Sequence, residues 1–200
     1  MPGRVGTLAR AGGVKVARAL SRFVLRLAGW RLLDLPTRPR KAVVLGYPHT
    51  SNWDFVLAML GLFALGVRPR WAGKDTMFAG WRGPLMRALG GIPVNRRERT
   101  GFVDRMTQEF GCNEDFLMVI APEGTRALTT GWKSGFLRIA HVAGVPVVPA
   151  VVDYPRRELG FLAELPMSGD DDADMAAIAA AYAGRQGCRP ENTGPIRLIK

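Results

Sequence analysis

The sequence predicts a single α/β domain with a mostly parallel or mixed sheet flanked by helices. Short apolar runs typical of buried strands alternate along the chain with helix-like segments, which is the pattern of an α/β fold. A chain of 200 residues is also long enough for one hydrophobic core and short for two. The composition, 48% apolar and 22% charged, excludes a disordered tail, a collagen-like fibre and a coiled coil.

The first predicted element is a basic amphipathic helix over residues 16–33. Its apolar side consists of Leu20, Phe23, Val24, Leu27 and Trp30. Its basic side carries Arg18, Arg22 and Arg26 at four-residue spacing. Such a helix can lie in a membrane interface, with aromatic residues among the acyl chains and arginines at anionic headgroups. The alternative is a helix packed on the domain with its arginines in solvent.

The positive charge of the chain is concentrated in the same region. The net charge is +11, and residues 1–41 contain ten basic residues and one acidic residue. We therefore expect residues 1–40 to be a membrane-associating segment for an anionic surface and residues 41–200 to be the α/β domain.

After a proline-containing break at residues 36–39, strands and helices alternate. The predicted strands are residues 41–47, 69–73, 92–95, 116–121 and 145–152. The predicted helices are residues 52–65, 82–89, 100–110, 133–143 and 173–183. The acidic turn at 169–172 is expected to cap the last helix, because acids favour a helix N-terminus. In a sheet of this kind, functional residues gather at the carboxyl ends of the strands.

The sequence also predicts the compartment. The longest uncharged run has fourteen residues, whereas a membrane-spanning helix needs about 20, and residues 1–40 lack the apolar stretch of a secretory signal. Cys112 and Cys188 are far apart, so with only His49 and His141 to assist them they imply no metal site and no disulfide framework. We expect a peripheral or monotopic protein on the cytoplasmic face of a membrane.

The first candidate catalytic pair is His49 and Asp54, at the junction of the first predicted strand and the following helix. On one continuous helix these two residues would point about 140° apart. They can meet if His49 lies in the turn before the helix and Ser51 or Asn52 is the N-cap. A carboxylate beside the imidazole would fix its tautomer, as a general base requires. The alternative is a structural histidine.

The second candidate site is the turn formed by residues 121–126, directly after the apolar strand. Pro-Glu-Gly-Thr-Arg projects one carboxylate, one hydroxyl and one guanidinium, and Gly124 permits the tight turn. Arg126 is a credible phosphate ligand. The alternative is a surface turn with a pair between Glu123 and Arg126. His141 is expected to be a buried or half-buried structural residue.

Taken together and in order, these motifs resemble those of the 1-acylglycerol-3-phosphate acyltransferase (PlsC-like) family of glycerolipid acyltransferases. The family signatures are H-x-x-x-x-D and, later, F-P-E-G-T-R-S. Ala121 and Ala127 stand where the F-P-E-G-T-R-S signature has Phe and Ser, and this difference bears on the pocket around Glu123. The matching blocks are residues 49–54, 91–96, 121–126 and 145–150, and residues 72–78 resemble a lysine-containing segment of the family.

The resemblance implies an O-acyltransferase with a glycerol-3-phosphate acyltransferase-like fold and no bound cofactor. Its co-substrate would be acyl-coenzyme A or acyl carrier protein, and its acceptor a lysophospholipid or a glycerol-phosphate-like alcohol. His49, poised by Asp54, would remove the proton of the acceptor hydroxyl as that oxygen attacks the thioester. Lys74, with backbone N–H groups, would stabilise the oxyanion.

The remaining residues of the matching blocks would bind substrate. Arg96 and Arg126 would hold the phosphate of the acceptor. Glu123 and Gly124 would shape the acceptor side, and Thr125 would add a polar contact. Pro146 would border the acyl channel, or would only stiffen the edge of its strand.

A protein without catalytic activity, which binds lipid or nucleic acid through the basic surface, is the alternative from another class. Aromatic residues are few, and no standard nucleic-acid motif is present, so nucleic acid is the less favoured partner. A G-x-S-x-G elbow is also absent from the sequence, which disfavours an α/β-hydrolase.

Overall fold

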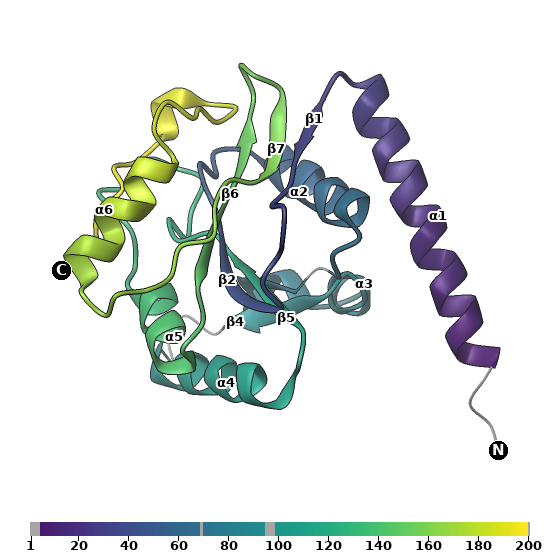
Figure 1. Cartoon of the computed structure of the whole chain (residues 1–200), viewed down its shortest axis with the longest axis horizontal. Helices are drawn as coiled ribbons and strands as arrows, with labels where there is room; N and C mark the ends of the chain where they lie inside the picture. The colour runs from purple at the N-terminus through teal and green to yellow at the C-terminus, as the bar shows by residue number, and fades with distance from the viewer. Residues whose placement is uncertain (1–4, 69, 95–98, 200) are drawn as a thin grey trace.

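The computed structural model describes residues 5–68, 70–94 and 99–199 (Figure 1). It contains a seven-stranded sheet with the order β1-β7-β6-β2-β5-β3-β4. Neighbouring strands are parallel except for the antiparallel pair β6 and β7. The predicted α/β class with a mostly parallel or mixed sheet is therefore confirmed. The strands are β1 (Arg31–Leu33), β2 (Lys41–Gly46), β3 (Trp71–Lys74), β4 (Gly91–Val94), β5 (Phe116–Ile120), β6 (Val147–Asp153) and β7 (Glu158–Phe161).

Helices cover both faces of the sheet. Alternate residues of β2 point to opposite faces, so Val43 and Leu45 join the core under α4, α5 and α6, whereas Ala42 and Val44 join the core under α2. The helices are α1 (Val5–Leu27), α2 (Asn52–Leu65), α3 (Arg82–Ala88), α4 (Arg99–Cys112), α5 (Gly135–Ala143) and α6 (Asp171–Ala181), with short 3-10 helices at Asp75–Phe78 and Pro190–Asn192.

Local signals set the ends of these helices. Ser51 is the N-cap of α2, and Gly66 ends this helix in the left-handed conformation at φ 73°. The side chain of Asp170 accepts hydrogen bonds from the N–H groups of Asp172 and Ala173, so the acidic turn caps α6 as predicted. His141 is half-buried on α5, with Nε2 2.7 Å from Asp174 Oδ2 on α6, which agrees with a structural role.

The start of the chain differs from its prediction. The helix expected over residues 16–33 ends at Leu27, and Gly29 then turns the chain at φ 74°. The last residues of the expected helix form β1, which pairs with β7, a strand that was not predicted. The expected boundary at residue 40, between the membrane-associating segment and the α/β domain, consequently falls between β1 and β2, which belong to one sheet.

The orientation of α1 also differs from expectation. Ser21 and Leu25 are buried, and α1 packs on α2 in a small core that includes Leu25 and Ala64. The Arg22 Nε donates to the Ala64 carbonyl over 2.9 Å, near the C-terminal end of α2, where a positive charge is favourable. An arginine therefore lies on the side of α1 that packs on α2. The apolar residues Phe23 and Leu27 of α1 are exposed.

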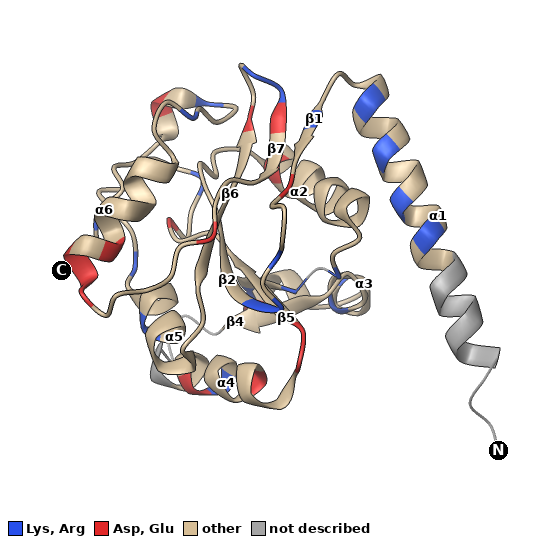
Figure 2. Cartoon of the chain, in the orientation of Figure 1, with Lys and Arg blue, Asp and Glu red and all other residues tan. Residues whose placement is uncertain are grey.

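Figure 2 shows the basic residues that recur along α1. None of the helices in the described part of the chain combines the length and the apolar content needed to cross a bilayer.

Candidate active site

The candidate site lies at the carboxyl edge of the sheet, where four neighbouring strands end. β2 leads into the turn that carries His49, and β5 leads into the turn that carries Glu123. Lys74 is the last residue of β3, and Tyr154 follows β6. Because these strands are parallel and adjacent, their carboxyl ends bring together residues that are far apart in the sequence.

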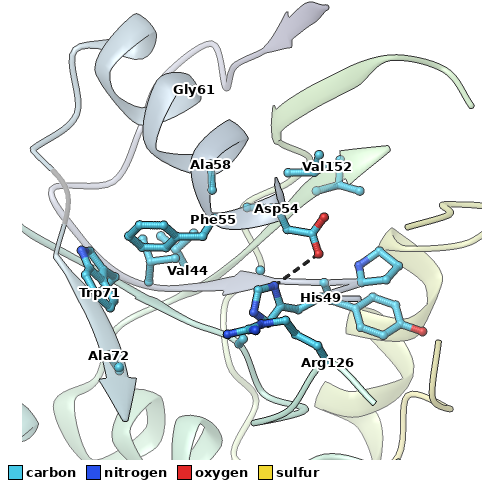
Figure 3. Close-up of a pocket in the computed structure, with 18 of the residues that line it drawn as sticks. Val44, His49, Asp54, Phe55, Ala58, Gly61, Trp71, Ala72, Arg126 and Val152 are labelled. Carbon is cyan, nitrogen blue, oxygen red and sulfur yellow. Dashed lines mark ion pairs between the residues drawn. The ribbon is translucent and has the colours of Figure 1, made fainter. Parts of the chain in front are cut away.

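His49 and Asp54 form a close pair (Figure 3). Their atoms Nδ1 and Oδ2 are 3.4 Å apart. His49 lies in the turn before α2, and Asp54 is the third residue of the helix, which is the arrangement that the sequence predicted. Since Nδ1 faces the carboxylate, the other ring nitrogen, Nε2, is left to exchange a proton with a substrate.

The start of α2 fixes the Asp54 carboxylate. Ser51 and Asp54 form a capping box, in which Asp54 Oδ2 accepts from the backbone N–H groups of Thr50 (2.7 Å) and Ser51 (2.8 Å). The other oxygen, Oδ1, accepts from the Tyr154 hydroxyl over 2.7 Å. Asp54 is 4% exposed, so both of its oxygens are occupied inside the protein.

These donors keep Asp54 ionised despite its burial. Burial by itself would raise the pKa of Asp54, but hydrogen bonds from His49, Tyr154 and the backbone of Ser51 outweigh burial, and the pKa is lowered. The carboxylate therefore stays negative beside His49, where it can stabilise an imidazolium that forms during proton transfer.

Glu123 has a different position from the one expected of it. Its side chain is buried, and Oε2 accepts the backbone N–H of His49 over 2.8 Å. Glu123 is not among the residues that line the cavity described below. Burial raises the pKa of Glu123, although the hydrogen bond from the His49 backbone offsets this in part. In this structure Glu123 holds the turn that carries His49, whereas the sequence predicts it on the acceptor side.

A cavity of about 590 Å³ extends from His49 between α2 and the sheet. Its size is typical of small-ligand sites, which occupy about 300–1,000 Å³. Since a helix rises about 1.5 Å per residue, the lining that α2 provides from Asp54 to Leu65 is roughly 16 Å long. The apolar lining includes Phe55, Ala58, Leu62 and Leu65 from α2 and Val44, Trp71, Val151 and Phe161 from the strands.

Several predicted binding residues do line this cavity. They are Lys74, Gly124, Thr125 and Arg126. Gly124 has a φ of 66°, a left-handed conformation that the tight turn after β5 requires. The exposed Arg126 side chain donates a hydrogen bond to Asn52 Oδ1, at the first residue of α2. The polar groups at the strand ends and the apolar surface along α2 thus belong to one continuous cavity.

Another predicted residue, Pro146, does not join this group. Pro146 precedes β6 and lies at the opposite end of that strand from the site. Its side chain does not line the cavity, and the residues near the end of β6 that do are Ala150, Val151 and Val152. Arg96 lies outside the described residues.

Tyr154 is a site residue that the sequence reasoning missed. Its position directly after a predicted strand was a signal, because the carboxyl ends of parallel strands meet at one edge of the sheet. Its hydrogen bond to Asp54 joins residues 100 positions apart, and no local pattern predicts such a pair.

Comparison with known proteins assigns the class. A model of the Acyltransferase family matches residues 34–153. The match covers more than half of the chain, and the chain belongs to this family. The family resemblance predicted from the four ordered motifs is thereby confirmed, and the protein is an acyltransferase.

The fold is similar to that of a solved acyltransferase. The crystal structure of the 1-acyl-sn-glycerophosphate (LPA) acyltransferase PlsC from Thermotoga maritima gives a TM-score of 0.58 with 16% sequence identity, over 92% of this chain and 82% of that chain. At this identity the similarity concerns the fold alone. A comparison with curated proteins gives no match.

The burial of Glu123 predicts a pH-dependent stability difference. Glu123→Gln keeps an acceptor for the His49 N–H and removes the charge. The pKa of Glu123 is raised in the folded protein. The free energy of unfolding of the wild type, compared with that of this variant, is therefore highest below the unfolded pKa of about 4.3, and it falls as pH rises through the folded pKa. We expect the variant to resist urea better than wild type at pH 8, by about 1.4 kcal/mol for each tenfold difference in proton affinity.

The advantage of the variant should shrink toward pH 4, where both side chains are neutral. Urea unfolding followed by tryptophan fluorescence at both pH values measures it. An advantage of equal size at both pH values would contradict the assigned burial of an ionised Glu123.

Proposed function

We propose that the protein transfers a fatty acyl group from an acyl thioester to a hydroxyl of a lysophospholipid or a glycerol-phosphate-like acceptor. The observation that carries this proposal is the close pair of His49 and Asp54 at the polar end of a cavity whose remainder is mostly apolar. An acyl chain fits the apolar lining along α2, and its thioester carbonyl would then lie at His49. The donor would be acyl-coenzyme A or the acylated form of acyl carrier protein.

In the proposed reaction the acceptor is itself the nucleophile. His49 Nε2 takes the proton of the acceptor hydroxyl while that oxygen attacks the thioester carbonyl carbon. Collapse of the tetrahedral intermediate breaks the carbon–sulfur bond, and the thiol leaves with the proton from His49. Asp54 keeps the imidazole oriented and stabilises its protonated form. The products are an ester and a free thiol.

The charged residues of the cavity have separate roles in this proposal. Lys74 lines the cavity from the end of β3 and would face the oxygen that becomes negative in the tetrahedral intermediate. Arg126 and the hydroxyl of Thr125 line it from the turn after β5 and would hold the phosphate of the acceptor. Arg96, predicted as a second phosphate ligand, remains a proposal from the sequence.

An acyl-transfer assay tests the function. Purified protein is given acyl-coenzyme A or acyl carrier protein with phosphorylated and unphosphorylated lysolipids, and the ester product is read by mass spectrometry. We expect transfer to the phosphorylated acceptors, and we expect His49→Gln to lower kcat by about 10² to 10⁴, the usual contribution of general acid–base catalysis.

His141→Gln is the matched control, because His141 is the second of the two histidines and does not line the cavity. It should retain the wild-type rate. Transfer by His49→Gln at the wild-type rate would overturn the role of His49, and failure of the wild type with every donor and acceptor pair would overturn the proposed function.

We further infer that α1 attaches the protein to the cytoplasmic face of an anionic membrane as a peripheral protein. Phe23 and Leu27 are 63% and 79% exposed on α1, and residues 13–27 of this helix include four basic residues and no acidic residue. Apolar residues beside a row of basic residues are the pattern of helices that lie in a membrane interface. Substrates with long acyl chains would reach the enzyme from the same surface.

Vesicle binding tests this attachment. Replacing both Phe23 and Leu27 by Ser should weaken association with phosphatidylglycerol-containing vesicles at least tenfold, because burial of each apolar side chain contributes about 1.5–3 kcal/mol. Val142→Ser is the matched control, since Val142 is 66% exposed on α5. Co-sedimentation that is unchanged in the double variant, or is lost equally in the control, would refute attachment through α1.

A further inference from the structure

Tyr154 occupies the one oxygen of Asp54 that the start of α2 leaves free. Oδ2 accepts from the backbone N–H groups of Thr50 and Ser51 and faces His49. Oδ1 accepts from the Tyr154 hydroxyl over 2.7 Å. Without this hydroxyl, Oδ1 would be a buried carboxylate oxygen with no donor, and the carboxylate plane would be held from one side alone. The hydroxyl thus restrains rotation of the group that orients His49.

The Tyr154 hydroxyl is chemically suited to be a permanent donor. Burial and the neighbouring Asp54 carboxylate both raise the pKa of Tyr154. The phenol therefore stays protonated throughout the pH range in which an enzyme of this class would be assayed. A neutral donor on Oδ1 also leaves the negative charge of Asp54 in place for His49.

The backbone of Tyr154 is held by its own turn and by the C-terminal segment. Its N–H donates to the Gln186 carbonyl over 3.1 Å, and its carbonyl accepts from the N–H of Arg157 over 3.2 Å. The hydroxyl therefore reaches Asp54 from a fixed point of the chain, at the end of a strand that is buried in the middle of the sheet.

The ring of Tyr154 is held by Trp30. The two rings meet edge to face, with centroids 5.4 Å apart and planes at 85°, a favourable geometry for aromatic pairs. The backbone of Trp30 is also fixed, because its backbone N–H donates to the Leu25 carbonyl of α1 over 2.8 Å. Arg157 ties the same junction by donating from Nη1 to the Ala28 carbonyl over 3.1 Å. The connection between α1 and β1 is thus packed against the turn that carries Tyr154.

We propose that Tyr154 is a positioning residue for the His49–Asp54 pair and that Trp30 acts through Tyr154 by holding its ring. The proposal rests on the acyl-transfer function proposed above. It assigns a role to a residue that directly follows the segment matched by the family model, and it links the end of α1 to the orientation of Asp54 through two side chains.

Tyr154→Phe tests the hydroxyl alone, because it keeps the ring that contacts Trp30. We expect kcat to fall about tenfold, in line with loss of a hydrogen bond to a charged group, with the KM for donor and acceptor unchanged within about twofold. The acidic limb of the pH profile of kcat should move to higher pH, because Asp54 loses the hydrogen bond that the Tyr154 hydroxyl donates to it. The other groups around Asp54, which are His49, Glu123 and the N–H groups of Thr50 and Ser51, are the same in both proteins.

Tyr182→Phe is the matched control. Tyr182 is also buried, and its hydroxyl bonds to the backbone of Leu45 and Ala150 instead of Asp54. It should lose comparable stability and keep the wild-type kcat and pH profile. Equal losses of kcat in the two variants, or a wild-type kcat in Tyr154→Phe, would overturn the proposal.

Trp30→Leu tests the second half of the proposal through a double-mutant cycle. It should lower kcat severalfold in the wild type and cause little further loss in Tyr154→Phe, because the hydroxyl that it positions is then absent. Equal factors in both backgrounds would show that Trp30 does not act through Tyr154.

A measurement that needs no substrate tests the positioning role of Tyr154 independently of the proposed acyl-transfer function. The protein has two histidines, so the NMR titration of the His49 ring protons can be followed with His141 as an internal reference. Tyr154→Phe should change the titration of His49 and leave that of His141 unchanged, whether or not any acceptor is turned over. An unchanged His49 titration would overturn the positioning role, and transfer activity decides the function independently.

Discussion

The hydrogen bonds of the Asp54 carboxylate are the interaction on which the site depends. Asp54 completes the capping box of α2 through Ser51 and at the same time faces His49 from 3.4 Å. One side chain therefore ends the strand-to-helix turn, starts the helix that lines the cavity and orients the imidazole. Oδ2 is shared by these roles, because it accepts the backbone N–H groups of Thr50 and Ser51 and also faces His49.

This arrangement has a cost in stability, because it buries the carboxylates of Asp54 and Glu123. Asp54 is stabilised by enough donors that its pKa is lowered, whereas burial raises the pKa of Glu123. Glu123 Oε1 has no hydrogen-bond partner within the described part of the chain. Burial thus disfavours the ionised form of the residue that holds the His49 backbone. Such a trade of stability for the geometry of a site is common in enzymes.

The parts of the fold that local patterns specify could be predicted from the sequence. The helix at residues 52–65 was predicted with its correct bounds, because Ser51 and Gly66 mark its ends. The same signals placed His49 and Asp54 side by side. The resemblance to the acyltransferase family came from motifs whose order and spacing are themselves local features.

The remaining features depend on contacts between distant segments. β1 has three residues and continues the apolar pattern of α1, so its pairing with β7 has no local signature. The packing of Arg22 against α2, the hold of Glu123 on the His49 backbone and the bond from Tyr154 to Asp54 join residues 42, 74 and 100 positions apart. A chain pattern identifies residue types suited to a site, and only the fold decides which of them face the substrate.

The kinetics of Asp54→Asn test the central claim most directly, because the substitution keeps the shape and an acceptor oxygen while it removes the charge beside His49. With the fold verified by circular dichroism, the account predicts that kcat for acyl transfer falls by about 10² or more and that the KM for donor and acceptor changes little. A kcat within twofold of wild type would contradict the assignment of His49 and Asp54 as the general-base pair.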